Sequence, residues 1–180
     1  MTLIEQTPLD GLFVLTSSSF QDERGLFNNL FRIEDSVYKR VWGERKVCQI
    51  NASTTKNVGC IRGMHYQKEP FSEAKLIRCL SGSVFDIAVD LRRESKTYKE
   101  WYGIYLSSKN YKSIFIPENF AHGFQVIEPN STLLYVHSAN WSKDHEAGVR
   151  YNDSAFGIKW PLPPTLISQK DSNYPNLNQI

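Results

Sequence analysis

Histidine, lysine and arginine occur together among alternating apolar residues in the stretch from Gly59 to Arg93. His65 stands three residues after Arg62, and Lys75 follows ten residues later inside an apolar run. A histidine acts as a base near neutral pH, particularly when a carboxylate fixes its tautomer. A lysine facing the same pocket can stabilise a developing enolate oxygen, and a buried tyrosine can return a proton. These residue types predict metal-free proton transfer if the fold brings them together.

A metal site is an alternative for the same residues. Such a site in a β-barrel needs about three nitrogen or oxygen ligands, and two histidines commonly stand close together on one strand. Gln67 occupies the place where an HxH pair would have its second histidine. His65, His122 and a carboxylate could still form the facial triad of a non-haem iron enzyme, so a metal-dependent oxygenase stays open.

Motifs and charge patterns of several other protein classes are absent. The chain has no GxSxG elbow, no Walker-type loop and no GxGxxG fingerprint. A net charge of +2 without blocks of like charge predicts no nucleic-acid surface. No apolar run approaches the ~20 residues of a membrane span, and the N-terminal residues are acidic where a signal peptide is basic. We therefore expect a cytoplasmic protein with no membrane partner.

Short strands are the elements expected to position these side chains. Residues 84–91 alternate with a period of two, and residues 74–79 form an apolar run around Lys75. The turn residues Ser81-Gly82-Ser83 between the two segments predict a hairpin that lines a pocket wall. Further strands are expected at residues 2–6, 12–16, 46–52, 101–106, 112–116, 125–127 and 133–137.

The spacing of these strands predicts an all-β fold. They recur about every ten residues, separated by Gly, Pro and Asn turns, which is typical of an antiparallel sandwich or barrel, with the jelly roll the best single choice. Residues 33–42 are the best helix candidate, because Ile33, Val37 and Val41 recur at intervals of four, and one or two short helices are expected in all. The remainder after residue 137 reads as extended loop. At 180 residues, one domain over 1–180 is expected.

The three cysteines predict free thiols. Cys48, Cys60 and Cys79 are odd in number, have no CxxC spacing and stand in apolar stretches. Buried free thiols in a reducing compartment are the expected state of such residues.

Seven segments in a fixed order are more specific than any periodicity. They are residues 62–67 (RGMHYQ), 75–78 (KLIR), 84–92 (VFDIAVDLR), 116–124 (IPENFAHGF), 151–153 (YND), 157–161 (GIKWP) and 168–171 (SQKD). Over nearly the whole chain they resemble the dTDP-4-dehydrorhamnose 3,5-epimerase family. The resemblance implies a cupin-type jelly roll that forms a homodimer, needs no metal or other cofactor, and acts on a nucleotide-linked 4-keto-6-deoxy sugar in surface-polysaccharide biosynthesis.

The resemblance also implies residue roles. The C4 ketone of such a sugar acidifies the hydrogens on C3 and C5, and inversion requires removal of a proton on one face and its return on the other. His65 would be the base, Asp171 its orienting partner, Lys75 the contact of the C4 oxygen and Tyr135 the acid on the opposite face. Arg24 and Arg62 would hold the diphosphate by bidentate hydrogen bonds. The other positions matching the nucleotide or sugar site are Asn29, Gln49, Asn51, His122, Trp141, Glu146 and Lys170.

Each of these residues also has an ordinary structural interpretation. Without the resemblance, His65 is a core or surface histidine whose ring nitrogens are hydrogen-bonded, Lys75 is a lysine at a sheet edge, and Tyr135 is an aromatic residue packed on its neighbours. Asp171 would cap a loop, and Arg24 would pin a turn. The other two histidines, His137 and His145, are expected to be structural or exposed.

The chain departs from the family pattern at the nucleotide end of the pocket. Asn29 and Ile50 stand where the family usually has glutamate and aspartate, and Asn140 replaces an aromatic residue. Trp141 stands where a tyrosine stacks on thymine, and its larger face suits a purine at least as well. A GDP-linked hexose or heptose therefore stays an alternative to a dTDP-linked sugar as the substrate. A 3,4-ketoisomerase and a non-catalytic sugar-binding jelly roll are the alternatives on this fold.

Overall fold

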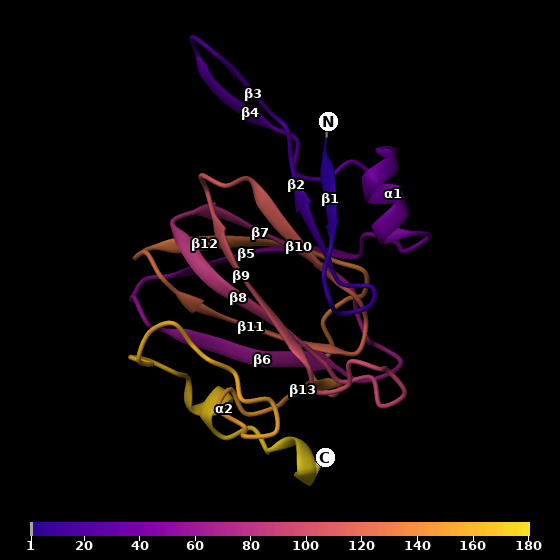
Figure 1. Ribbon diagram of the computed structural model, residues 1–180, viewed down its shortest axis with the longest axis vertical. Coiled ribbons are helices and arrows are strands. Elements are labelled where there is room, and N and C mark those ends of the chain that lie inside the picture. Colours follow the sequence, from indigo (N-terminus) through magenta and orange to yellow (C-terminus); the bar gives the residue numbers. More distant parts are fainter. Residues whose placement is uncertain (1) are drawn as a thin grey trace.

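Two antiparallel sheets form the body of the chain in residues 2–180, the part that this computed structural model describes (Figure 1). The six-stranded sheet contains, in spatial order, β1 (Leu3–Gln6), β2 (Phe13–Thr16), β10 (Lys112–Ile116), β7 (Lys75–Ser81), β12 (Ser131–His137) and β5 (Gln49–Thr55). The five-stranded sheet contains β13 (Glu146–Gly148), β6 (Ile61–Gln67), β11 (Phe120–Val126), β8 (Ser83–Asp90) and β9 (Trp101–Ser107). This is the predicted all-β jelly roll.

Smaller elements surround the two sheets. A hairpin of β3 (Ser19–Asp22) and β4 (Gly25–Asn28) projects away from the body (Figure 1). The helices are α1 (Ser36–Trp42) and α2 (Gln169–Ser172), followed by the 3₁₀ turn η1 (Leu177–Gln179). The structure therefore agrees with the prediction of one or two short helices.

The core lies in three layers because both sheets are covered on their outer faces. Between the sheets, Val84 and Ala88 of β8 pack against Leu133 of β12. On the other face of β8, Ile87 and Val89 contact the C-terminal segment. The alternation of residues 84–91 thus separates two buried faces, as expected for a strand covered on both sides.

Helix α1 covers the outer face of the six-stranded sheet. Tyr38 and Trp42 are buried there against Phe115 of β10. The helix begins later than predicted, because the Asp35 carboxylate caps it by accepting a hydrogen bond from the Val37 amide at 2.9 Å. It ends at Gly43, whose φ of +61° is a conformation that glycine favours.

The predicted hairpin of residues 74–79 and 84–91 is wrong. Strand β7 pairs with β10 and β12 in one sheet, whereas β8 pairs with β9 and β11 in the other. Gly82, at φ +74°, carries the chain between the sheets, and a Cβ there would lie 2.4 Å from the Ser131 Oγ. A local turn signal shows that the chain bends, but strand pairing is decided by distant segments.

Other boundaries differ from the sequence-based expectations. Strand β10 has the predicted bounds, while β5 extends through residues 53–55, which were expected to form a loop. Strand β11 begins five residues before the expected start at residue 125. The C-terminal region, expected to be extended loop, also contains β13 and α2.

All three cysteines are free. Cys60 and Cys79 are buried as expected, but Cys48 is exposed, so the prediction of burial is wrong there. Its thiol donates to the Ser138 carbonyl at 3.0 Å. Within residues 2–180, none of the helices has the length and apolar character required to cross a membrane.

Candidate active site

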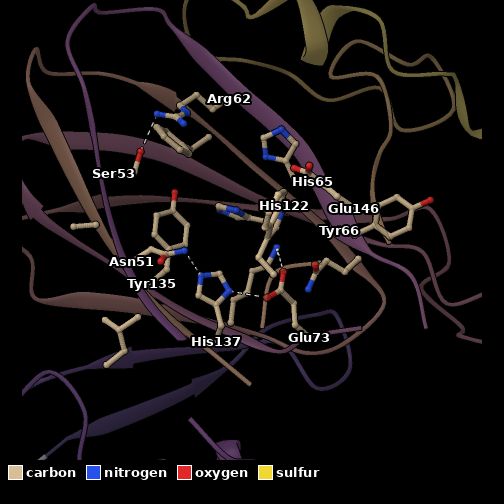
Figure 2. A pocket seen from close by; sticks show the side chains of 16 residues that line it. Asn51, Ser53, Arg62, His65, Tyr66, Glu73, His122, Tyr135, His137 and Glu146 are labelled. Carbon is tan, nitrogen blue, oxygen red and sulfur yellow. Dashed lines mark hydrogen bonds and ion pairs between the residues drawn. The ribbon is translucent and has the colours of Figure 1, made fainter. Parts of the chain in front are cut away.

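A cavity of about 500 Å³ opens between the two sheets. Its walls carry side chains from β5, β6, β7, β11 and β12 and from the loop before β13 (Figure 2). The predicted site residues along it are Asn51, Arg62, His65, Lys75, His122, Tyr135, Trp141 and Glu146. The period of two directs Tyr135 and His137 of β12 inward together. Arg62 and His65 of β6 are three residues apart, and the register between β6 and β11 shifts between the positions that they pair with.

His65 and Asp171 form a hydrogen-bonded pair at one wall. The His65 Nε2 lies 2.8 Å from the Asp171 Oδ1, and the Gly63 amide donates to the Asp171 Oδ2 at 2.9 Å. Asp171 stands in the first turn of α2, where its amide donates to the Ser168 Oγ at 3.0 Å. With Nε2–H donating to the carboxylate, the His65 Nδ1 remains as a proton acceptor.

The Asp171 carboxylate stays ionised despite its burial. Burial by itself would raise its pKa, but the hydrogen bond from His65, the charge of His65 and the Gly63 amide lower that pKa overall. The Asp171 residue is 4% exposed. An ionised carboxylate behind the ring favours the imidazolium that forms when His65 accepts a proton.

Tyr135 lies at the opposite wall, on β12 of the six-stranded sheet. Its ring packs edge-on against His122 at 5.9 Å and stacks on His137 at 5.8 Å between centroids. Its hydroxyl is turned into the cavity on the side of Arg62 (Figure 2). Burial raises the pKa of the phenol, which therefore stays protonated at neutral pH.

Lys75 shares a buried carboxylate with His137. The Lys75 Nζ lies 3.2 Å from the Glu73 Oε1, and the His137 Nδ1 lies 2.8 Å from the Glu73 Oε2 (Figure 2). All three residues line the cavity. His137 is thus buried and paired, which agrees with an expected structural role, although strand β12 also turns it toward the cavity two residues after Tyr135.

His122 forms a third imidazole–carboxylate pair. Its Nε2 lies 2.9 Å from the Asp86 Oδ2, and both side chains are almost completely buried. Burial raises the pKa of Asp86 and lowers the pKa of His122, so each side chain is pushed toward its neutral form. His145, in contrast, pairs with the Ser142 Oγ at 2.8 Å and packs on Phe71, in agreement with its expected structural role.

The remaining predicted residues lie at the rim. The Arg62 guanidinium donates to the Ser53 Oγ at 2.8 Å. Trp141 is 55% exposed, and its backbone amide donates to the Gln49 Oε1 at 2.9 Å. The Lys170 Nζ lies 2.5 Å from the Glu146 Oε1. A neighbouring hollow of about 700 Å³ shares Arg62, His65 and Glu146 with the cavity and includes Lys170 and Asp171.

Comparison with known proteins gives the family of this chain. A sequence profile of the dTDP-4-dehydrorhamnose 3,5-epimerase family matches residues 6–179. The chain belongs to this family. The Shigella flexneri dTDP-4-dehydrorhamnose 3,5-epimerase is 38% identical over 93% of this chain and 92% of its own length. The Salmonella typhimurium enzyme is 36% identical over 99% of this chain and 97% of its own length.

Solved structures of family members have the same fold. The dTDP-6-deoxy-D-glucose-3,5-epimerase of Legionella pneumophila, solved with dTDP-4-keto-L-rhamnose, superposes with a TM-score of 0.94 at 34% identity, covering 100% of this chain and 95% of that one. The Elizabethkingia anophelis epimerase gives 0.91 at 34% identity, covering 99% and 97%. The chain is thus an isomerase of the sugar-nucleotide epimerase class, as predicted, and these relatives do not support the oxygenase or binding-module alternatives.

Among the predicted residues that do not line the cavity, Gln49, Lys170 and Asp171 contact residues that do, whereas Arg24 and Asn29 do not. Arg24 is 85% exposed at the tip of the β3–β4 hairpin and pairs with Asp22, two residues before it, at 2.6 Å. Asn29 follows β4 and is absent from the cavity wall. The hairpin that carries Arg24 and directly precedes Asn29 projects away from the body (Figure 1), so their contacts with substrate remain predictions.

Sequence reasoning missed Glu73, the carboxylate that joins Lys75 and His137. The family motif used for the prediction begins at Lys75, and a glutamate in a polar turn gives no signal of its own. The available signal was its spacing: residues two apart in an extended segment share a face, so Glu73 accompanies Lys75 into the cavity.

Proposed function

We propose that this protein inverts C3 and C5 of a nucleotide-diphosphate-linked 4-keto-6-deoxy sugar, and that the chain forms one catalytic domain. The observation that carries the proposal is the placement of proton-transfer groups on opposite walls. His65 stands on the five-stranded sheet and Tyr135 on the six-stranded sheet, with one cavity between them. A sugar ring held in that cavity presents one face to each group.

The chemistry follows from these positions. The His65 Nδ1 removes the proton from C3 or C5, and the electron pair of the C–H bond moves into the enolate on C4. The Lys75 ammonium stabilises the enolate oxygen, and Asp171 stabilises the His65 imidazolium. Tyr135 then donates its proton to the other face of the same carbon, which inverts the centre. The raised pKa of Tyr135 supports this role, since it keeps the phenol loaded with the proton that it donates.

The nucleotide diphosphate is expected to bind along the rim. Arg62 is the cationic side chain of the rim next to the cavity, and its planar fork suits a diphosphate. The exposed indole of Trp141 offers a flat surface for a base. Gln49 and Asn51 lie close together beside it, the Gln49 Nε2 donating to the Asn51 Oδ1 at 3.1 Å. The base can be thymine or guanine, and the sugar a hexose or a heptose.

A homodimer would complete this site. The projecting hairpin exposes three large apolar side chains, Phe20, Leu26 and Phe27, together with Arg24. A free hairpin with such a surface is expected to pack on another chain. Docking on a second copy would bring a second arginine, and Asn29, to the diphosphate end of the pocket. Sedimentation should give a dimer, and Phe27→Asp should weaken it.

The proposed setting is cytoplasmic synthesis of sugars for surface polysaccharides. The three free thiols agree with a reducing compartment.

Deuterium exchange tests the proposed reaction. The protein is incubated in deuterium oxide with dTDP-linked and GDP-linked 4-keto sugars, and incorporation at C3 and C5 is followed by NMR spectroscopy. We expect exchange at both carbons and its loss in His65→Ala. Exchange with no sugar nucleotide would refute the epimerase assignment, and exchange at C3 alone would limit the reaction to one centre.

A further inference from the structure

A buried carboxylate joins two cavity residues that stand on different strands. Glu73 contacts Lys75 with one oxygen and His137 with the other, at 3.2 and 2.8 Å (Figure 2). The Glu73 side chain is only 8% exposed. A carboxylate removed from water in this way is costly unless both oxygens are paired, as they are here.

The backbone fixes this arrangement. Lys75 begins β7 and pairs directly across the sheet with His137 at the end of β12. The turn next to Glu73 is held by two hydrogen bonds, from the Ala74 amide to the Ser138 Oγ at 2.8 Å and from the Ser138 amide to the Ala74 carbonyl at 3.0 Å. Cross-strand partners share a face of the sheet. Residues 73, 75 and 137 therefore converge without any bound ligand.

The charges around Lys75 give the carboxylate a role. The Lys75 ammonium is buried, and a buried charge is costly unless an opposite charge pairs with it. The ionisable groups that act on it or lie beside it are Glu73, Asp86, His122, His137 and Tyr135. Asp86 has His122 as its hydrogen-bond partner, whereas Glu73 contacts the lysine directly.

Glu73 itself stays ionised. Burial by itself would raise the pKa of this carboxyl, but the hydrogen bond from His137 and the charge of Lys75 lower it overall. His137 is in turn held on both ring nitrogens, since its Nε2 lies 3.4 Å from the Asn51 Nδ2. The imidazole thus fixes one carboxylate oxygen, and the other oxygen is left for the lysine.

We propose that Glu73 is a positioning residue of the epimerisation and that it acts through Lys75. Anchored by His137, its carboxylate holds the Lys75 ammonium in an ion pair and aims it at the place where the enolate oxygen forms. This inference rests on the proposed function, because it assigns Lys75 to that oxygen. An oxyanion-stabilising donor is effective only when its charge and direction are set before the reaction.

A double-mutant cycle on the full-length protein tests the coupling. In the deuterium-exchange assay, Glu73→Gln should lower kcat about tenfold with KM changed less than threefold, and Glu73→Asp, which keeps the charge, should recover part of the loss. Lys75→Met should lower kcat about 10²-fold or more. The double variant should be no slower than Lys75→Met within threefold, because Glu73 has nothing left to position. Glu100→Gln, an exposed carboxylate on the same chain, is the charge-matched control and should leave kcat unchanged.

A second measurement does not depend on turnover. The Glu73 carboxylate holds the Lys75 Nζ in an ion pair at 3.2 Å, so acetic anhydride should acylate Lys75 faster in Glu73→Gln than in the wild type, relative to the exposed Lys109 as internal standard. Unchanged labelling of Lys75, or losses in kcat that simply multiply in the double variant, would overturn the inference. If the wild type exchanged no deuterium, the proposed function would be refuted instead, while the labelling would still report whether Glu73 holds the Lys75 ammonium.

Discussion

Replacement of Asp171 by asparagine should disable His65 without emptying the cavity. The carboxylate accepts two hydrogen bonds, from the His65 Nε2 at 2.8 Å and from the Gly63 amide at 2.9 Å. An amide supplies one acceptor and one donor, so one of these contacts is lost in either orientation. If the amide NH₂ faces the ring, His65 adopts the tautomer with Nδ1 protonated and can no longer accept a proton. If it faces Gly63, two donors meet.

The size of the effect follows from these contacts. In a hydrolase triad, the same carboxylate-to-amide change beside a histidine lowers kcat about 10⁴-fold through the wrong tautomer. For Asp171→Asn we expect a loss of about 10³-fold to 10⁴-fold, which corresponds to about 4–5.5 kcal/mol at 1.36 kcal/mol per decade. KM should change little, because Asp171 is 4% exposed and lies behind the imidazole. Loss of one buried acceptor should also lower stability by about 1–3 kcal/mol.

Asp153 provides a matched control in the same C-terminal segment. It is a buried carboxylate that accepts hydrogen bonds from the backbone amides of Ala155 and Leu177 at 2.8 and 2.6 Å, and it does not line the cavity. Asp153→Asn should lower stability to a similar degree and leave the exchange rate per folded molecule within about threefold of wild type. The assay is deuterium exchange at C3 and C5, together with urea unfolding of both variants. The reasoning would be refuted if Asp171→Asn kept more than a tenth of kcat, or lost no more than Asp153→Asn.

Three further outcomes are expected. Tyr135→Phe should keep deuterium exchange on the His65 side but lower the rate of inversion at least about 10²-fold, because the opposite face loses its acid. NMR analysis of the product measures inversion, and an unchanged rate would contradict the role of Tyr135. Gly63→Ala should be strongly destabilised in thermal unfolding, since its Cβ would lie 2.6 Å from the Gly123 Cα. Gly157→Ala is the control: nothing lies within 4 Å of its Cβ, so its free energy of unfolding should fall by only about 1 kcal/mol. The melting temperature should fall as pH drops below about 5, and a flat profile down to pH 3 would contradict this. Burial alone would raise the pKa values of Asp171 and Glu118, but hydrogen bonds from His65 and Arg45 lower them overall. These two carboxylates therefore stabilise the fold above the ordinary carboxyl range, and that stabilisation is lost as pH falls through the lowered pKa values.

The sequence was most informative where local pattern and packing agree. The period of two in residues 84–91 predicted β8, and the run 112–116 gave β10 with its observed bounds. The pairing of β7 with β12 rather than β8 was not predictable in the same way, because it joins residues about 55 positions apart. Turn residues report a bend at Gly82 but do not say which sheet each strand enters.

For the candidate site, too, local motifs were informative and contacts between distant residues were not predictable. The motif around His65 pointed to a base, but nothing in it located Asp171, 106 residues away, which came from the resemblance alone. Glu73 was missed because its importance depends on two partners, one of them 64 residues distant. Arg24 lies on the projecting β3–β4 hairpin and Asn29 directly follows it, so this fold places both outside the cavity wall, and their contact with substrate depends on the homodimer that we propose.

Three imidazole–carboxylate pairs surround one cavity, and their environments assign different tasks to them. His122 is 4% exposed, and burial favours the neutral forms of both His122 and Asp86, which suits a fixed hydrogen-bonding pair. His137 has both ring nitrogens engaged, and its carboxylate is shared with Lys75. His65 differs from both in exposure, since its side chain is 32% exposed, compared with 5% for His122 and 11% for His137. Its carboxylate partner, unlike Asp86, has a lowered pKa and so remains charged when the ring gains a proton. A base must be able to reach substrate and to carry a positive charge, and among these pairs His65 with Asp171 meets both conditions.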